Sequence, residues 1–218
     1  MSLPKWLFAT LFIVSIQQTI AQHNYNGYNL LGIQGAISFF NINSSDLATQ
    51  QGVGFGVGFT TRGAFRNDFD LIYGLHFQND KIAVHASELA GLNTQYIEYT
   101  IQSANLSLLG SYNLINKHLS IEFGPILRFN GKMALNNSKF EDYIIRDYHT
   151  LTAKEIEEIA KFNALIVVGI TSGIEHFRLS AQYQYGVTNM LKPLNGKVEN
   201  SSFNGNSATL ILSGTVYF

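Results

Sequence analysis

The chain has 218 residues, a formal net charge of −1 and no cysteine. This charge balance provides no basic surface for nucleic acid, and the lack of cysteine excludes disulfides, a thiol nucleophile and thiolate metal sites. Only 13% of the residues are charged and 13% are aromatic, whereas about 25% charged residues is usual for soluble domains. The composition is that of a protein with little water-facing surface.

The first element in chain order is an N-terminal targeting segment. Lys5 precedes an apolar stretch from Trp6 to Ile16, and Thr19-Ile20-Ala21 places small residues at a cleavage site. We expect residues 1–21 to be a secretory signal peptide and residues 22–218 to form one domain. No later apolar stretch approaches the ~20 residues that a membrane helix needs, so a closed β-barrel is the remaining way to span a bilayer.

The segment from Gly52 to Phe59, GVGFGVGF, alternates glycine with valine or phenylalanine. A nucleotide-binding loop spaces its glycines irregularly, whereas a strict period of two indicates a β-strand with two unlike faces. Similar alternation recurs in seven other segments, so we predict eight strands. They cover residues 31–39, 52–62, 68–78, 96–113, 119–129, 166–175, 177–188 and 209–218.

Two of these strands are irregular. In the fourth, the apolar phase changes between Ile101 and Leu106, which predicts a bulge near residues 102–105. In the fifth, Pro125 removes a ladder donor, and we expect a second bulge there.

The connections alternate between short turns and long polar loops, as in transmembrane barrels. We therefore predict an all-β fold, an eight-stranded antiparallel up-and-down transmembrane β-barrel in the bacterial outer membrane, with long loops outside and both termini periplasmic. Thr152 to Glu155 matches a helix capping box and predicts one short helix of two to three turns in the third extracellular loop. The long loops cover about residues 41–51, 81–94, 132–163 and 190–206.

The two faces of the strands differ enough to predict which of them contacts lipid. A soluble eight-stranded barrel would turn its apolar face inward around a ligand. A row of four glycines on a solvent-facing strand would weaken that strand without any gain in packing. In a narrow lumen that side chains fill, the same glycines leave room for larger residues from other strands. We therefore expect valine and phenylalanine to face lipid and glycine to face the lumen.

Charged residues on the polar faces form a candidate lumen network. Acids and arginines occur in near-equal number, which predicts pairing across a filled interior. A charge-lined conduction path is the alternative. The network comprises Arg62, Asp68, Asp70, His76, Glu122, Arg128, Glu175 and Arg178.

The long loops hold the other candidate residues. His85 and Ser87 in the second loop, or His149 beside Asp147 in the third, could serve a lipid-modifying barrel enzyme, although solvated polar residues are the simpler interpretation. No histidine spacing indicates a metal site, and we expect no cofactor. The apolar edge of the predicted helix either folds over the barrel mouth or offers a surface to a partner. It consists of Ile156, Ile159 and Phe162.

The C-terminal strands resemble a known family. AQYQYGVTN, from Ala181 to Asn189, resembles the ARYxxGLTN strand of the PorT-like outer-membrane β-barrel family of Bacteroidetes, with Gln182 in place of the usual arginine. Phe123-Gly124-Pro125 resembles the GP strand of that family, and residues 210–218 are similar to its closing strand. The resemblance implies a small outer-membrane barrel without enzymatic activity, and the namesake of the family serves type IX protein secretion.

The functional hypothesis is therefore a non-enzymatic outer-membrane barrel that contacts lipid and protein partners. It would act as an accessory or scaffolding subunit of a complex for secretion, assembly or uptake. A narrow channel and a lipid-A-modifying enzyme are the alternatives.

Overall fold

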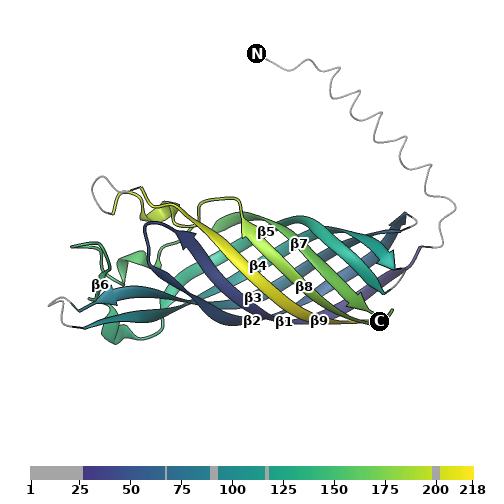
Figure 1. Cartoon of the computed structure of the whole chain (residues 1–218), viewed down its shortest axis with the longest axis horizontal. Helices are drawn as coiled ribbons and strands as arrows, with labels where there is room; N and C mark the ends of the chain where they lie inside the picture. The colour runs from purple at the N-terminus through teal and green to yellow at the C-terminus, as the bar shows by residue number, and fades with distance from the viewer. Residues whose placement is uncertain (1–26, 67, 89–92, 116–117, 198–201) are drawn as a thin grey trace, which may run out of the picture.

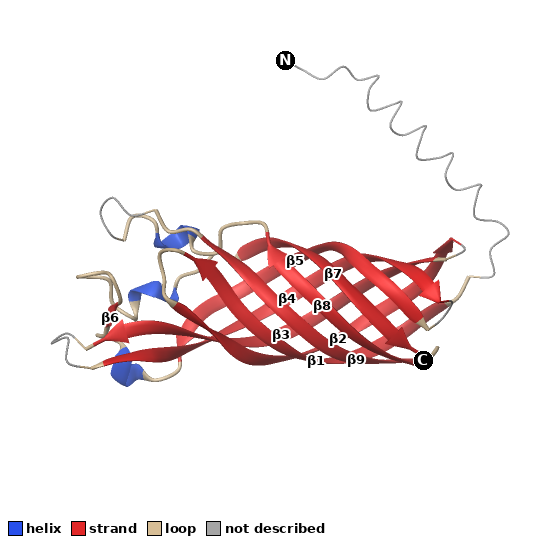
Figure 2. Cartoon of the chain, in the orientation of Figure 1, coloured by secondary structure: helices blue, strands red, loops and turns tan. Residues whose placement is uncertain are grey.

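The computed structural model describes residues 27–66, 68–88, 93–115, 118–197 and 202–218, and the predicted signal peptide lies outside them. Antiparallel strands dominate, joined by three short 3-10 turns (Figure 2). The strands are β1 (Asn29–Ser44), β2 (Thr49–Arg66), β3 (Phe69–Ser87), β4 (Thr94–Ile115), β5 (Leu119–Leu135), β6 (Ile144–Ile145), β7 (Phe162–Gly173), β8 (Phe177–Gly186) and β9 (Gly205–Tyr217). The turns are η1 (Ser138–Phe140), η2 (Glu155–Glu157) and η3 (Lys192–Leu194).

Eight of the strands close into a ring (Figure 1). Neighbours follow the order β2-β1-β9-β8-β7-β5-β4-β3, and pairing of β2 with β3 completes the circle. The two-residue strand β6 lies outside the ring and pairs with the end of β3. The predicted eight-stranded up-and-down barrel is confirmed. Among the described residues, no helix is both long and apolar enough to cross a membrane.

The two ends of the barrel differ. At one end, which we call the turn end, the strands are joined by short connections, and Phe218 exchanges backbone hydrogen bonds with Leu31. At the other, the loop end, the four longer connections and all three 3-10 turns gather (Figure 2). The described N-terminal residues and the C-terminus both lie at the turn end (Figure 1).

Several strands are much longer than a membrane requires. A transmembrane strand needs about 9–11 residues. Strand β8 has 10 residues, but β3 has 19 and β4 has 22. The wall formed by β1 to β5 therefore continues past the membrane section at the loop end. Most of the predicted second loop, residues 81–94, is strand.

In the membrane section the side chains face as predicted. Val53, Phe55, Val57 and Phe59 are 56–63% exposed on the outside of β2, while Gly54, Gly56 and Gly58 of the same strand are buried toward the interior. Glycine is required here because neighbouring strands and side chains approach closely. A Cβ at residue 58 would lie 2.4 Å from the Cδ2 atom of His76.

At the loop end this polarity is reversed. Ile97, Tyr99 and Ile101 of β4 are buried and face inward, whereas outward Glu98 and Gln102 are exposed. The alternation of β4 is unbroken from residue 97 to 113, and its pairing with β3 has no register shift. The predicted bulge in residues 102–105 is therefore wrong. The apolar phase changes because the barrel interior itself changes from polar to apolar at that height.

The irregularity in this region belongs to β5. Ile101 faces Met133 and Ser103 faces Asn130, so the extra residue lies in β5. Around Pro125, by contrast, β5 keeps one register with each neighbour, and the bulge predicted there is also wrong. The residue before the proline, Gly124, lies very close to β4. A Cβ at this position would lie 2.2 Å from the backbone oxygen of Leu108.

The apolar interior of the loop end is covered by the loops. We call this assembly the apolar cap. Its members come from the long strands, from the connection between β1 and β2, from the third loop and from the connection between β8 and β9. They are Phe40, Ile42, Leu47, Ile82, Val84, Ala86, Ile97, Tyr99, Ile101, Met133, Ile145, Leu151, Ala153, Ile156, Ile159, Met190, Leu191, Leu194 and Phe203.

The predicted helix of the third loop is a single 3-10 turn, η2. The Thr152 backbone N–H donates to Glu155 Oε2 at 2.8 Å, as in a capping box, but the N-cap residue of the turn is Lys154, whose side chain makes no capping hydrogen bond. The chain leaves helical geometry at Glu158, which is extended. Ala160 then donates its N–H to the backbone oxygen of Met190 at 2.8 Å. This pairing with the neighbouring loop leads the chain directly into β7, so the residues after Glu158 form no further helical turns.

Candidate functional site

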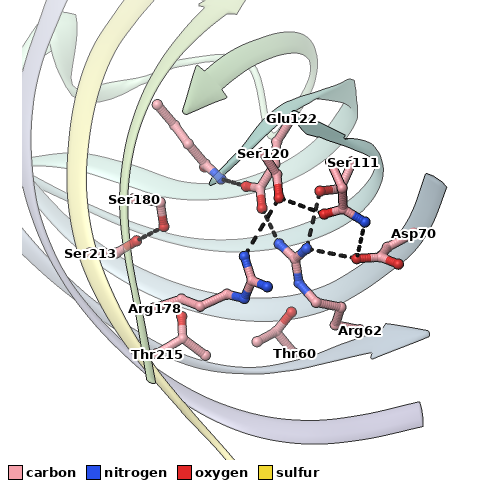
Figure 3. Close-up of polar contacts among 12 residues, drawn as sticks. Thr60, Arg62, Asp70, Ser111, Ser120, Glu122, Arg178, Ser180, Ser213 and Thr215 are labelled. Carbon is pink, nitrogen blue, oxygen red and sulfur yellow. Dashed lines mark hydrogen bonds and ion pairs between the residues drawn. The ribbon is translucent and has the colours of Figure 1, made fainter. Parts of the chain in front are cut away.

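The membrane section of the interior contains two arginine-centred networks. In the first, Arg62 of β2 lies among Asp70 of β3, Ser111 of β4 and Glu122 of β5 (Figure 3). Arg62 Nη1 is 2.9 Å from Asp70 Oδ2 and 3.1 Å from Ser111 Oγ, and Arg62 Nη2 pairs with Glu122 Oε1. Gln182 donates to the second oxygen of Glu122 at 3.0 Å. One guanidinium thus connects four strands.

The same network reaches the turn end. Asp70 also accepts hydrogen bonds from the Tyr28 hydroxyl, at 2.7 Å, and from Asn113. Arg178 of β8 donates to Ser120 at 3.5 Å (Figure 3). Ser120 in turn donates to Asn113. Polar contacts therefore cross the barrel from β8 to β3.

The second network lies closer to the apolar cap. Arg128 of β5 donates to Asn105 Oδ1 and Gln78 Oε1, both at 3.0 Å. Its Nη1 atom lies 3.7 Å from Asp80, which also accepts a hydrogen bond from Ser38. The guanidinium carbon lies 5.9 Å from the ring centroid of Phe40, a member of the cap.

Buried charges balance across the two networks. Three arginines (Arg62, Arg128, Arg178) and three acids (Asp70, Asp80, Glu122) are each no more than 3% exposed. Removing one partner of a buried pair strands the other without water, so these residues hold one another in place. Because each network joins several strands, the networks link those strands across the interior of the barrel.

The structure brings together most, not all, of the predicted lumen residues. Asp68 lies exposed in the turn between β2 and β3, outside the buried networks, and Glu175 lies exposed in the turn between β7 and β8. Glu175 lines a small recess at the turn end together with Arg62 and Arg178. His76 faces the interior but no network includes it. Asp80 was missed because the predicted third strand ended at Gln78.

A cavity of about 50 Å³ lies between the networks and is lined by members of both. Among the described residues, His76 Nε2, Gln78 Nε2 and Thr171 Oγ1 line it without a hydrogen-bond partner. A few waters fit there, since each needs about 10–15 Å³ and polar neighbours. Members of the two networks lie on either side of this cavity, and the apolar cap covers the loop end.

The structure separates the three residues predicted as a partner surface. Ile156 and Ile159 are 0% and 5% exposed and belong to the apolar cap, so for them the alternative of folding over the barrel mouth holds. Phe162 begins β7 on the outer wall, 50% exposed, and packs edge-on against Phe129. The three therefore do not form one surface.

Polar residues cover the outside of the cap. Lys154 contacts Glu141 at 3.1 Å and Glu157 at 3.9 Å, and these two acids raise the pKa of Lys154 above its ordinary value. Tyr148 donates its hydroxyl to the backbone oxygen of Asp46 at 3.1 Å. Partial burial, followed by the nearby acids, raises the pKa of Tyr148 and keeps its hydroxyl in the neutral, donating form.

Among the histidines predicted as candidates, His85 and Ser87 lie beside Asp147 in a pocket at the loop end, while His149 is exposed and lies outside that pocket. Among the described residues, the buried Nδ1 atom of His85 has no hydrogen bond to Ser87 or to Asp147. Among the described residues, no group of three or more histidine or acidic side chains is arranged to hold a metal ion.

Fold and interior together define a class: a small transmembrane β-barrel whose lumen is filled by side chains. A solved structure with this fold is that of Neisserial surface protein A, NspA, which is 14% identical over 86% of this chain and 97% of its own, with a TM-score of 0.50. Ail of Yersinia pestis is 15% identical, over 89% of this chain and 100% of its own, with a TM-score of 0.45. OprG of Pseudomonas aeruginosa is 9% identical, over 87% and 95%, with a TM-score of 0.44. No family model and no curated protein matches the chain.

Proposed function

We propose that this chain is a non-enzymatic outer-membrane β-barrel that serves as an accessory or scaffolding subunit of a complex for secretion, assembly or uptake. In this proposal residues 1–21 are a cleaved signal peptide, the turn end with both termini faces the periplasm, and the loop end is extracellular. The observation that carries the proposal is the filled interior. Two buried networks and an apolar cap leave only the outer surfaces of the barrel available for contact.

Two further features support a scaffolding role. The described residues of the loops pack on a common apolar core, so this part of the loop end presents a fixed shape. In addition, the sequence between Ala181 and Asn189 resembles the PorT-like family, whose namesake serves type IX protein secretion. Both features favour protein contact over transport or catalysis.

The direct test uses the full-length chain in the bacterium that produces it. A photo-crosslinking residue is introduced at exposed Lys139 of the loop end, and in a second variant at lipid-facing Val57. We expect a discrete crosslink to one protein from at least one position. We also expect co-migration with that protein at fixed stoichiometry in native electrophoresis after extraction in a mild detergent. A monomer without crosslinks from either position contradicts the proposal.

The two alternatives have their own readouts. A narrow channel predicts unitary conductance in planar bilayers, which the filled interior argues against. A lipid-A-modifying enzyme predicts a changed lipid A mass on deletion of the gene. A positive result in either assay would replace the scaffolding role.

A further inference from the structure

A pocket of about 420 Å³ opens at the loop end, apart from both interior networks. Strand β3 contributes His85 and Ser87, and β4 contributes Thr94, which pairs with Ser87 across the two strands. The third loop contributes Arg146 and Asp147. This volume is within the range of small-molecule sites. The lining is rich in groups that donate or accept hydrogen bonds.

The pocket is held in shape by the turn from Ile145 to Tyr148. Ile145 is fully buried in the apolar cap, and the Tyr148 N–H donates to the Ile145 oxygen at 3.1 Å. Arg146 donates its backbone N–H to the oxygen of His85 at 3.1 Å. Tyr148 stacks on Phe203 at 5.4 Å, besides its hydrogen bond to Asp46. A ligand would therefore meet a preformed site and would not have to order the loop.

Asp147 has an unusual backbone conformation within this turn. Its φ is +70°, and it is the only non-glycine residue with positive φ among the described ranges. Glycine occupies this region freely, whereas other residues are disfavoured there. The Asp147 side chain is 79% exposed, and its carboxylate lies 3.7 Å from Nε of Arg146. This geometry places an acceptor and a planar donor side by side at the pocket.

The chemistry of the lining selects the ligand class. Arg146 and Asp147 cancel in charge, so the pocket does not favour an anion. The hydroxyls of Ser87 and Thr94 both donate and accept, and the buried Nδ1 atom of His85 has no partner among the described residues. A neutral molecule with many hydroxyl groups satisfies such a mixture.

An aromatic side chain completes this set. Tyr96, 48% exposed, lies edge-on to His85 with ring centroids 5.0 Å apart. Its ring offers an apolar surface beside the pocket, as the C–H face of a sugar ring requires. We propose that this pocket binds a neutral saccharide unit, carried either by a glycolipid of the same membrane or by a free oligosaccharide. This inference does not depend on the scaffolding role.

The test uses the full-length mature chain in phosphatidylcholine nanodiscs, because sugar-based detergents would compete. Free maltotriose and triacetylchitotriose are titrated by saturation-transfer NMR. In a second arm, nanodiscs containing digalactosyldiacylglycerol are compared with plain ones for the shift of the His85 and Tyr96 resonances. We expect saturable binding in at least one arm, and the responding arm identifies the source of the sugar.

Variants make the assignment specific. Asp147→Gly removes the carboxylate but suits the positive φ, so the turn is kept while affinity falls about tenfold or more. Arg146→Ala is expected to lower the affinity by a similar factor. Glu98→Gln, which alters an exposed acid paired with Lys81 outside the pocket, should bind as the unaltered chain does. The proposal is overturned by no saturable binding in both arms, by unchanged affinity in both pocket variants, or by binding of inorganic phosphate alone.

Discussion

Replacing Arg62 with methionine tests whether the interior networks hold the barrel together. The arginine pairs with Asp70 and Glu122, and all three side chains are at most 4% exposed. Methionine is close in length but leaves both carboxylates buried without their cation. Breaking a buried pair in this way costs about 3–5 kcal/mol. With two acids stranded, we expect the upper end of that range.

The free energy of unfolding is measured by urea titration in lipid vesicles. Trp6, the single tryptophan, lies in the predicted signal peptide, so far-UV circular dichroism and heat-dependent gel mobility report the transition. The matched control is Arg66→Met, an exposed arginine on the same strand, expected to change stability by no more than about 0.5 kcal/mol. Adding Asp70→Asn and Glu122→Gln to the Arg62 variant should recover most of the loss. Equal effects of the two single variants would refute the structural role of the network.

Three further changes probe other parts of the fold by the same titration. Gly58→Ala should destabilise by about 1–3 kcal/mol, because the new Cβ collides with His76, while Gly35→Ala, with nothing within 4 Å of its Cβ, should be tolerated; similar values for both would contradict the close approach. Ile156→Ala should cost about 2–5 kcal/mol and speed proteolysis of the third loop, since it opens a void in the apolar cap. Asp147→Gly should leave stability unchanged or raise it by up to about 1 kcal/mol, and a loss larger than that would show that the carboxylate supports the turn.

The membrane section was predictable because each strand there lies in one environment. Residues 52–59 alternate without exception, and lipid outside with side chains inside leaves a single interpretation of that alternation. The same alternation predicts which charged residues face the interior. Counting every second residue along the paired strands places four of them on the inner face: Arg62, Asp70, Glu122 and Arg178. Near balance of charge then indicated that they would pair.

The sequence-based predictions fail where the barrel interior changes from polar to apolar along one strand. In β4 the apolar residues change face after Ile101, and a local bulge explains that pattern as well as a change of interior does. Only the 22-residue length of the strand distinguishes the two, because it exceeds what a bilayer needs. The predicted sixth strand runs to residue 175, but β7 ends at Gly173, which no periodicity predicts.

The pocket residues illustrate a different limit. Asp147 is about 60 positions from His85 and Ser87 in sequence, and the pairing of Ile144 and Ile145 with the end of β3 brings them together. A two-residue strand carries too little pattern to be predicted. Strand β6 pairs on the side that β2 leaves free, since β2 begins at Thr49, opposite Val84.

The second network and the apolar cap adjoin along two strands, which explains how a chain without disulfides orders the described residues of its loop end. On β1, Ser38 of the second network is followed two residues later by Phe40 of the cap. On β3, Asp80 is followed in the same way by Ile82. Because Arg128 lies 5.9 Å from the Phe40 ring, a shift of the second network would disturb the base of the cap. Contacts with the membrane section therefore help to hold the outer surface of the cap in place. A partner or saccharide bound there would contact a surface that is already ordered.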